Sequence, residues 1–159
     1  YIYAGNYYSK IRNIIPTYNA FTNYHKKLSI YGNSDINLNS NEFVTICNRV
    51  TQEKLKKLEL EYGGIVCILN SNCIQIPGKI FYEASSDKKI LVVLDGKYKD
   101  QIAAELTKYQ RYYTCENNEE DIIQALKSMK NIELSNEYAL ANFSPKIISK
   151  RLIDICCND

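Results

Sequence analysis

Residues 63–96 read GGIVCILNSNCIQIPGKIFYEASSDKKILVVLDG, and this stretch predicts the fold class. A glycine pair leads into an uninterrupted apolar run at 65–69, and a second such run follows at 90–94 before Asp95-Gly96. Runs of this kind are typical of strands that are buried on both faces of a parallel sheet. Between them, Pro77 opens a helix that we expect to extend to about Ser86. The stretch therefore predicts a strand–helix–strand unit at the centre of an α/β domain.

Strands and helices also alternate on both sides of this unit. We expect further strands at 1–4, 28–31, 43–47 and 111–115, the last of them near an edge of the sheet, and a polar loop at 33–42. We expect helices at 12–26, from Thr51 through Tyr62, at 98–109, after a capping box of Asn117 and Glu120, and from Ser144-Pro145 onward with an apolar stripe of Ile148, Leu152 and Ile155. The pattern predicts a doubly wound, Rossmann-like α/β domain with a six-stranded, mostly parallel sheet and helices on both faces.

Length and composition indicate one domain of ordinary size. The chain has 159 residues, of which 45% are apolar and 24% charged, a composition that favours a folded domain with a sizeable core over a disordered chain. A net charge of +2 makes nucleic acid an unexpected partner. The sequence contains no apolar run long enough for a transmembrane helix and no segment resembling a signal peptide. Because the chain begins with Tyr1, we interpret it as a processed chain or a fragment.

The six cysteines do not form a metal-binding pattern. None of them belongs to a CxxC pair, and the single histidine, His25, follows a helical pattern as a solvated helix-end residue. Cys47, Cys67 and Cys115 lie in apolar or aromatic runs, which favours buried reduced thiols over a disulfide framework. This usage predicts a cytoplasmic protein without a metal site.

In open parallel sheets, ligands bind beyond the carboxyl ends of the strands. In the loop after the first strand, Gly5 permits close backbone approach, and Lys10 or Arg12 could meet an anion beside the start of the next helix. The loop matches neither GxGxxG nor the P-loop pattern, and a plain turn is the alternative. The loop of Asn48, Arg49 and Val50 could contact a base, or it could be a simple strand-to-helix turn.

The loop after the strand at 65–69 carries the most informative residues. Pro77 sets the first helical turn, and the N–H groups of Gly78, Lys79 and Ile80 are expected to point outward as anion donors. Glu83 lies farther along this helix, where its carboxylate could accept from a ribose diol or simply face solvent.

Several segments in this order resemble one enzyme family. QIPGKIFYEASSDKKILVVL (75–94) is similar to the donor-binding segment of GT-B glycosyltransferases, in the retaining, family-four-like branch that builds bacterial polysaccharides. YAGNYYSKIRN (3–13) resembles the first strand and phosphate loop of the C-terminal domain in that family, and IYGN (30–33) its second strand and turn. NEEDIIQAL (118–126) and Phe143-Ser144 resemble the later helices.

The resemblance implies that residues 1–159 form a single nucleotide-sugar-binding domain, one half of a GT-B fold, without the N-terminal acceptor domain. It implies that Gly5, Arg12 and Lys10 approach the donor diphosphate, that Gly78, Lys79 and Ile80 hold it, that Asn48, Arg49 and Val50 lie against the base, and that Glu83 binds ribose. Gln75 stands where the family has the first of two glutamates, and Asn6 stands where it often has arginine. Arg12, Lys79 and Gln75 are the residues expected to take part in catalysis.

The activity implied is transfer of a sugar from a UDP- or GDP-linked donor to a glycan or lipid-linked glycan acceptor bound by the missing half. No Asp-x-Asp motif occurs, so we expect a metal-independent transferase without a cofactor, inactive as this fragment alone. The cysteine usage predicts a cytoplasmic location, and lipid-linked acceptors in the family that the chain resembles add peripheral attachment to the inner face of the membrane as a further expectation.

Other functions of the same fold remain open. They include a non-catalytic nucleotide-binding or interaction domain and one half of a sugar-nucleotide epimerase. A phospho-receiver domain is not favoured, because the first and third strands end at Gly5 and Cys47-Asn48 and not at acidic residues.

Overall fold

The computed structural model describes residues 1–72 and 74–157 and contains a six-stranded sheet. All neighbouring strands are parallel, and their order is β3-β2-β1-β4-β5-β6. The strands are β1 (Ile2–Ala4), β2 (Leu28–Tyr31), β3 (Val44–Cys47), β4 (Gly64–Ile68), β5 (Lys89–Leu94) and β6 (Tyr113–Glu116). This is the strand order of a doubly wound, Rossmann-like fold, so the predicted fold class is confirmed, with a sheet that is parallel throughout.

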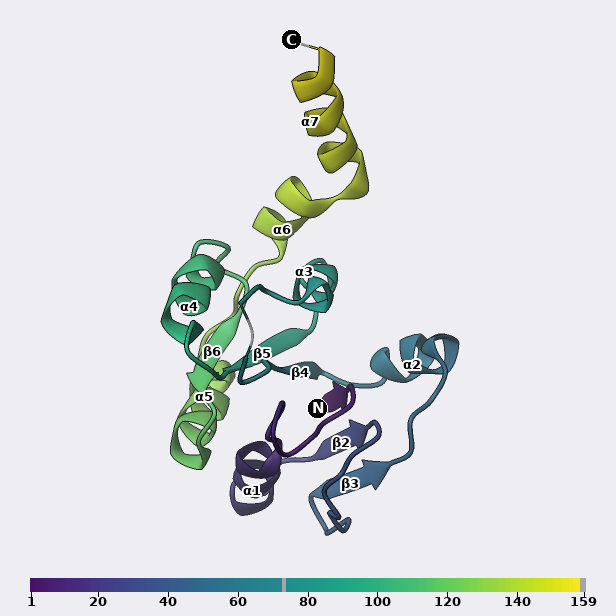
Figure 1. The fold of residues 1–159 in the computed structure, drawn as a ribbon, viewed down its shortest axis with the longest axis vertical. Coiled ribbons are helices and arrows are strands. Elements are labelled where there is room, and N and C mark those ends of the chain that lie inside the picture. The colour runs from purple at the N-terminus through teal and green to yellow at the C-terminus, as the bar shows by residue number, and fades with distance from the viewer. Residues whose placement is uncertain (73, 158–159) are drawn as a thin grey trace.

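Helices cover both faces of the sheet (Figure 1). One face packs against α1 (Ile15–Asn23) and α5 (Glu119–Asn131), and the other against α2 (Gln52–Glu59), α3 (Gly78–Glu83) and α4 (Lys99–Thr107). Side chains alternate along each strand: Val66 and Ile68 of β4 join the first core, whereas Ile65 and Cys67 join the second. Since both cores need apolar residues, the central strands are apolar without interruption.

The elements predicted from the central stretch are confirmed with small shifts in their ends. Every residue of β4 is buried, and so is every residue of β5 except its first, Lys89. The strand predicted near an edge, β6, is an edge strand. Thr51 caps α2 by accepting a hydrogen bond from the Lys54 backbone N–H at 3.4 Å.

Two predicted helix starts are wrong. The first helix begins at Ile15, not near residue 12, because Arg12 belongs to a tight turn in which its backbone N–H donates to the Tyr8 carbonyl at 2.8 Å. The residue that caps α5 is Asn118, which accepts from the Asp121 N–H at 2.9 Å. The side chain of the expected cap, Asn117, instead donates to loops outside the helix.

The C-terminal region differs from the expectation of a single helix. It contains α6 (Glu137–Phe143), which the sequence did not predict, before α7 (Pro145–Cys157). Figure 1 shows α7 extending away from the sheet. Its expected apolar stripe exists in sequence, but Ile148, Leu152 and Ile155 are exposed.

The cysteines in the described part of the chain are free thiols. As predicted, Cys67 and Cys115 are buried, whereas Cys47 is half-buried and Cys156 and Cys157 are exposed. Cys73 lies outside the described residues. His25 is exposed and follows the end of α1, as predicted, with its ring stacked on Phe43 at 4.6 Å between centroids. No helix among the described residues is long and apolar enough to cross a membrane.

Candidate functional site

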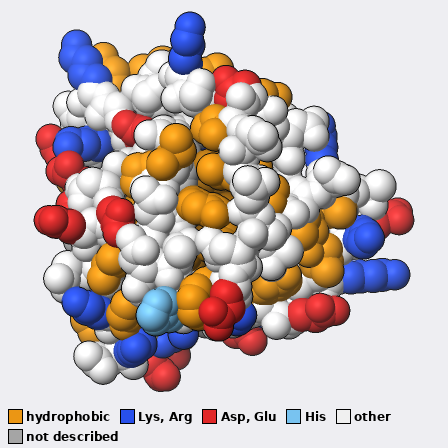
Figure 2. Space-filling view, turned by 90° about the horizontal axis from the view of Figure 1, so that it is seen from below, with side chains coloured by type: hydrophobic (Ala, Val, Ile, Leu, Met, Phe, Trp, Pro, Cys, Tyr) orange, Lys and Arg blue, Asp and Glu red, His pale blue; other side chains and the backbone are white. Residues whose placement is uncertain are grey.

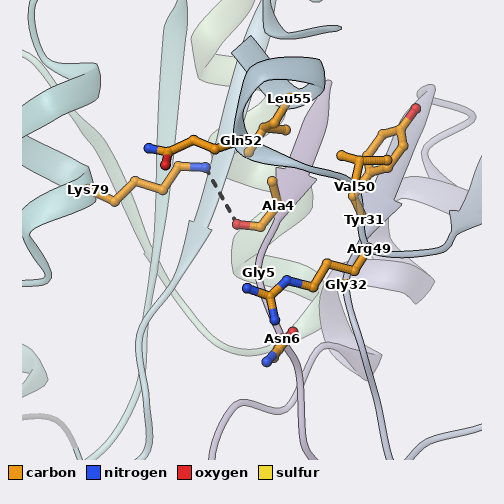
Figure 3. A pocket seen from close by; sticks show the side chains of 10 residues that line it. All are labelled: Ala4, Gly5, Asn6, Tyr31, Gly32, Arg49, Val50, Gln52, Leu55 and Lys79. Atoms are coloured by element: carbon orange, nitrogen blue, oxygen red, sulfur yellow. Dashed lines mark hydrogen bonds between the residues drawn. The ribbon is translucent and has the colours of Figure 1, made fainter.

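A cavity of about 350 Å³ opens at the carboxyl edge of the sheet, where the strand order reverses between β1 and β4 (Figure 3). Loops after β1, β2 and β3 form it together with α2 and α3. Its lining residues are Ala4, Gly5, Asn6, Tyr31, Gly32, Arg49, Val50, Gln52, Leu55 and Lys79. This is the position at which doubly wound domains bind their ligands. The cavity brings together four of the predicted site residues, Gly5, Arg49, Val50 and Lys79.

Two glycines form the backbone wall of this cavity. The Gly5 N–H donates to the Tyr31 carbonyl at 2.9 Å, which holds the loop after β1 against the end of β2. A Cβ atom added to Gly32 would lie 2.0 Å from the Gly5 carbonyl oxygen, far inside van der Waals contact. Only glycine fits at position 32, and this steric requirement explains the glycine of the IYGN turn.

Lys79 reaches across the cavity from α3. Its Nζ lies 3.3 Å from Glu59 Oε1 and 3.5 Å from the carbonyl oxygen of Ala4, so the ammonium lies at the carboxyl end of β1. Sequence reasoning missed Glu59. Its spacing from Gln52 and Leu55 by seven and four residues puts all three on one helical face, and this periodicity could have indicated it.

Arg12 lies in a smaller adjoining cavity of about 90 Å³, which shares Ala4 and Lys79 with the first. Its Nε donates to Asn70 Oδ1 at 2.9 Å, and its Nη1 donates to the Asn6 carbonyl at 3.1 Å. The guanidinium thus joins the loops after β1 and β4. Among the described residues no carboxylate lies within ion-pair distance of it.

Arg49 approaches from the opposite side. In Figure 3 its guanidinium is directed toward Gly5 and Asn6. Arg12, Arg49 and Lys79 therefore surround the end of β1 from three different loops or helices, although Glu59 partly balances the charge of Lys79. No carboxylate lines either cavity, and an anion is the ligand class that this arrangement favours.

Several predicted residues lie outside these cavities. Lys10 is exposed, and its backbone carbonyl accepts from the Ser71 hydroxyl at 3.1 Å. Asn48, Gln75 and Gly78 are also exposed and line neither cavity.

The prediction that Ile80 offers a free N–H is wrong. That group donates to the Pro77 carbonyl at 3.0 Å, because the first turn of α3 closes tightly. The Ile80 side chain is buried in the core against β4 and β5. The helix is only six residues long, so the loop and Lys79, more than the helix terminus, determine the chemistry here.

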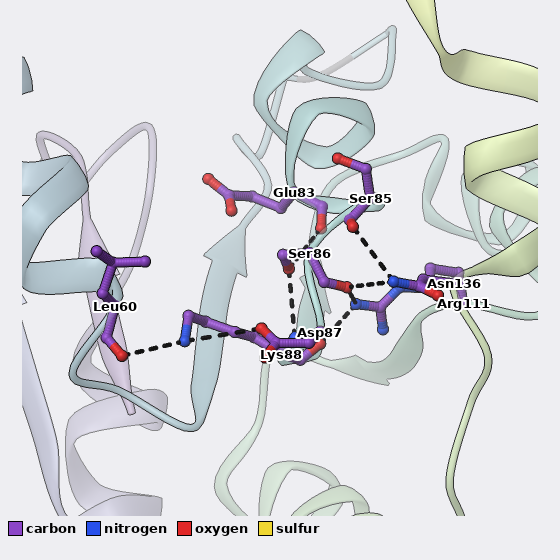
Figure 4. Close-up of polar contacts among 8 residues, drawn as sticks. All are labelled: Leu60, Glu83, Ser85, Ser86, Asp87, Lys88, Arg111 and Asn136. Carbon is purple, nitrogen blue, oxygen red and sulfur yellow. Dashed lines mark hydrogen bonds and ion pairs between the residues drawn. The ribbon is translucent and has the colours of Figure 1, made fainter.

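Glu83, the last residue of α3, lines neither cavity, but it is half-buried beside the same group of charges. Burial raises the pKa of its carboxyl group above the ordinary value, and the nearby Glu59 raises it further, whereas Lys79 and Lys88 oppose this. Figure 4 shows the segment that follows. There the Ser86 hydroxyl donates to the Glu83 backbone carbonyl at 2.7 Å, so the end of the helix is fixed.

The Cys67 thiol lines the smaller cavity together with Lys79, and its burial disfavours the thiolate form. Burial raises the pKa of Cys67 to about 12, so the thiolate is scarce near neutral pH. Within the described residues no group of three or more His, Cys, Asp or Glu side chains is arranged to hold a metal ion.

Comparison with known proteins adds no family to this description. No protein-family model and no curated protein matches the chain.

Proposed function

We propose that this domain binds a nucleotide-diphosphate sugar, UDP- or GDP-linked, in the carboxyl-edge cavity, as the donor half of a retaining, metal-independent GT-B glycosyltransferase. One observation carries the proposal. Cationic side chains from three separate segments, Arg12, Arg49 and Lys79, surround a glycine-lined backbone wall at the point where the strand order reverses. This matches what a diphosphate needs, namely positive charge and close backbone approach.

In this proposal the diphosphate lies against Gly5, between Lys79 and Arg49, with Arg12 behind it. The base lies beside Val50, and Glu83 accepts from the ribose hydroxyls. When the bond between the sugar carbon and the diphosphate oxygen breaks, the electron pair stays on that oxygen, the oxygen of the acceptor hydroxyl bonds to the sugar carbon, and the hydroxyl proton passes to the leaving diphosphate. The cations then stabilise the charge on the leaving group. Gln75 lines neither cavity, and in this scheme it reaches the sugar only when the N-terminal half closes over the donor.

The acceptor, a glycan or lipid-linked glycan, belongs in this scheme to the N-terminal half. The fragment alone therefore binds donor without transferring sugar, since positioning of donor and acceptor requires both halves. A cytoplasmic location, with peripheral attachment to the inner face of the membrane, is part of the same proposal.

Amide NMR titration of the chain with UDP, GDP, ADP and CDP tests the binding. A half-site should bind one diphosphate with a Kd of roughly 0.1–1 mM, and saturable shifts should appear at Gly5, Gly32 and Val50. Lys79→Gln should weaken binding by about ten-fold, since one charge-assisted contact is lost. Lys56→Gln, an exposed lysine on α2 outside the cavity, is the matched control. Saturable shifts elsewhere, or equal affinity in both variants, would refute the site.

Catalysis is tested in the protein that joins both halves. Arg12→Ala and Lys79→Ala should each reduce turnover, with circular dichroism showing that each variant is folded. Unchanged turnover in both variants contradicts the electrostatic role. Donor binding without any sugar transfer by the joined protein would instead favour the non-catalytic nucleotide-binding alternative.

A further inference from the structure

A second cavity, of about 510 Å³, lies at the opposite edge of the sheet, among the amino ends of β4 and β5 and the C-terminal ends of α1 and α5. We call it the basic cavity. Its lining residues are Tyr1, His25, Lys26, Lys27, Gly63, Gly64, Lys89, Leu126, Met129 and Lys130. Four lysines line it and no carboxylate does. In Figure 2, blue lysine or arginine side chains lie beside the pale blue histidine.

Neutral groups hold these lysines in place. Lys26 Nζ lies 5.9 Å from the centroid of the Tyr1 ring, and Lys130 Nζ lies 4.9 Å from that of Tyr24. Lys27 Nζ lies 5.3 Å from the Phe43 ring and donates to the Glu42 backbone carbonyl. Lys89 Nζ donates to the backbone carbonyl of Met129. In the described part of the chain none of the four forms an ion pair.

Helix dipoles compensate only part of this charge. The C-terminal ends of α1 and α5 lie here, and each is equivalent to about half a negative charge at most. Capping of these two ends therefore accounts for about one of the four positive charges. No ion pair among the described residues offsets the rest, so this concave surface keeps an excess of positive charge, which repels cations and concentrates anions.

From this surplus we infer that the basic cavity is a second binding site, distinct from the carboxyl-edge cavity, for a ligand that carries two or more phosphate groups. The aromatic rings restrict the lysine side chains, which lowers the entropy lost when they engage a ligand. The paired glycines at 63 and 64 add backbone that carries no bulky side chain. A soluble phosphorylated metabolite and the headgroups of an anionic membrane share this chemistry.

The test separates these two sources. Inorganic pyrophosphate is titrated into the full chain and followed by amide NMR, and vesicles of phosphatidylcholine with and without phosphatidylglycerol are used in co-sedimentation. Lys26→Gln/Lys130→Gln is compared with Lys54→Gln/Lys57→Gln, which removes two exposed lysines of α2. Far-UV circular dichroism of both variants confirms that they fold.

We expect pyrophosphate to cause saturable shifts at Gly63 and Gly64, and the Lys26/Lys130 variant to weaken this binding by about ten-fold or more, as two charged contacts are lost. Vesicle binding that requires phosphatidylglycerol and is lost in the same variant, without pyrophosphate binding, assigns the site to a membrane headgroup. The inference is overturned if neither probe binds, or if the two variants bind equally.

The outcome is independent of the proposed donor site. Pyrophosphate could also enter the carboxyl-edge cavity. Binding there would shift the amide signals of Gly5 and Gly32, and Lys79→Gln would weaken it. Binding found only there leaves the donor proposal intact and overturns the second site.

Discussion

The buried arginine that anchors the end of α3 gives the sharpest test of the structural reasoning. Arg111 is 2% exposed, and its guanidinium donates to three backbone carbonyls. Two of these bonds, to Ser86 at 2.7 Å and to Lys88 at 2.6 Å, lie in the segment drawn in Figure 4, and the third reaches Ala84 at 2.8 Å. Among the described residues no carboxylate pairs with it. It therefore ties the turn between α3 and β5 to the start of β6, and α3 carries Lys79.

The magnitude follows from what Arg111→Met removes and what it retains. Methionine keeps the apolar stem but removes three charge-assisted hydrogen bonds, each contributing about 1.5–3 kcal/mol. Burial lowers the pKa of Arg111 and makes its charge costly, so removal of the charge recovers several kcal/mol. The Ser86 carbonyl also retains the Asn136 amide at 3.3 Å, whereas the bond to Ala84 lies in the buried interior. We expect a net loss of about 3 kcal/mol in the free energy of unfolding.

Urea unfolding followed by circular dichroism measures this loss. For a domain of this size it corresponds to a fall in Tm of about 6–12 °C. The control is Arg151→Met on α7, an exposed side chain with one hydrogen bond to Asn142 Oδ1 at 2.8 Å. It should change stability by less than about 0.5 kcal/mol. If Arg111→Met changes the free energy of unfolding as little as Arg151→Met does, the desolvation cost of Arg111 offsets its hydrogen bonds, and Arg111 does not anchor the end of α3.

Three further predictions follow from the same structure. Gly32→Ala should destabilise the domain by about 3 kcal/mol, because its Cβ would strike the Gly5 carbonyl, whereas Gly63→Ala has open space and should be nearly neutral; thermal unfolding compares them, and equal Tm values would contradict the close approach. The pKa of Glu83 in the folded state is raised above its ordinary value of 4.5. The protonated carboxyl group therefore stabilises the fold fully below pH 4.5, and this stabilisation is lost as the pH rises through the folded-state pKa. Glu83→Gln should therefore make the free energy of unfolding less dependent on pH above 4.5, and an unchanged pH profile from urea titrations would disprove the shift. Iodoacetamide at pH 8 should label the exposed thiols of the folded chain quickly and the buried ones, whose pKa burial raises to about 12, only after unfolding; mass spectrometry that finds early labelling of Cys67 or Cys115 would argue against this, and Cys156 and Cys157 serve as the internal comparison.

The parallel sheet and its two helical layers follow from local patterns in the sequence. Two apolar runs without alternation, at 65–69 and 90–94, require burial on both faces, and that requirement implies parallel strands between two helical layers. Local signals placed Thr51 correctly as a helix cap, since its hydroxyl acts within one turn. The sequence also shows glycines in the loops after β1 and β2, but it does not show that Gly32 lies against the Gly5 carbonyl.

The contacts of the loop side chains depend on how distant segments pack together. Lys79 and Glu59 are separated by 20 residues and meet only because α2 and α3 lie on the same face of the sheet. Asn117 does not cap α5 as predicted, because its side-chain amide donates to the Asn13 carbonyl and to Asp95 Oδ2. Both partners are distant in the sequence. The basic cavity has the same origin, because its four lysines come from three separate segments that the parallel sheet aligns at one edge. Periodicity reports which face of an element is buried, whereas the partners of polar side chains depend on strand order and packing across the whole domain.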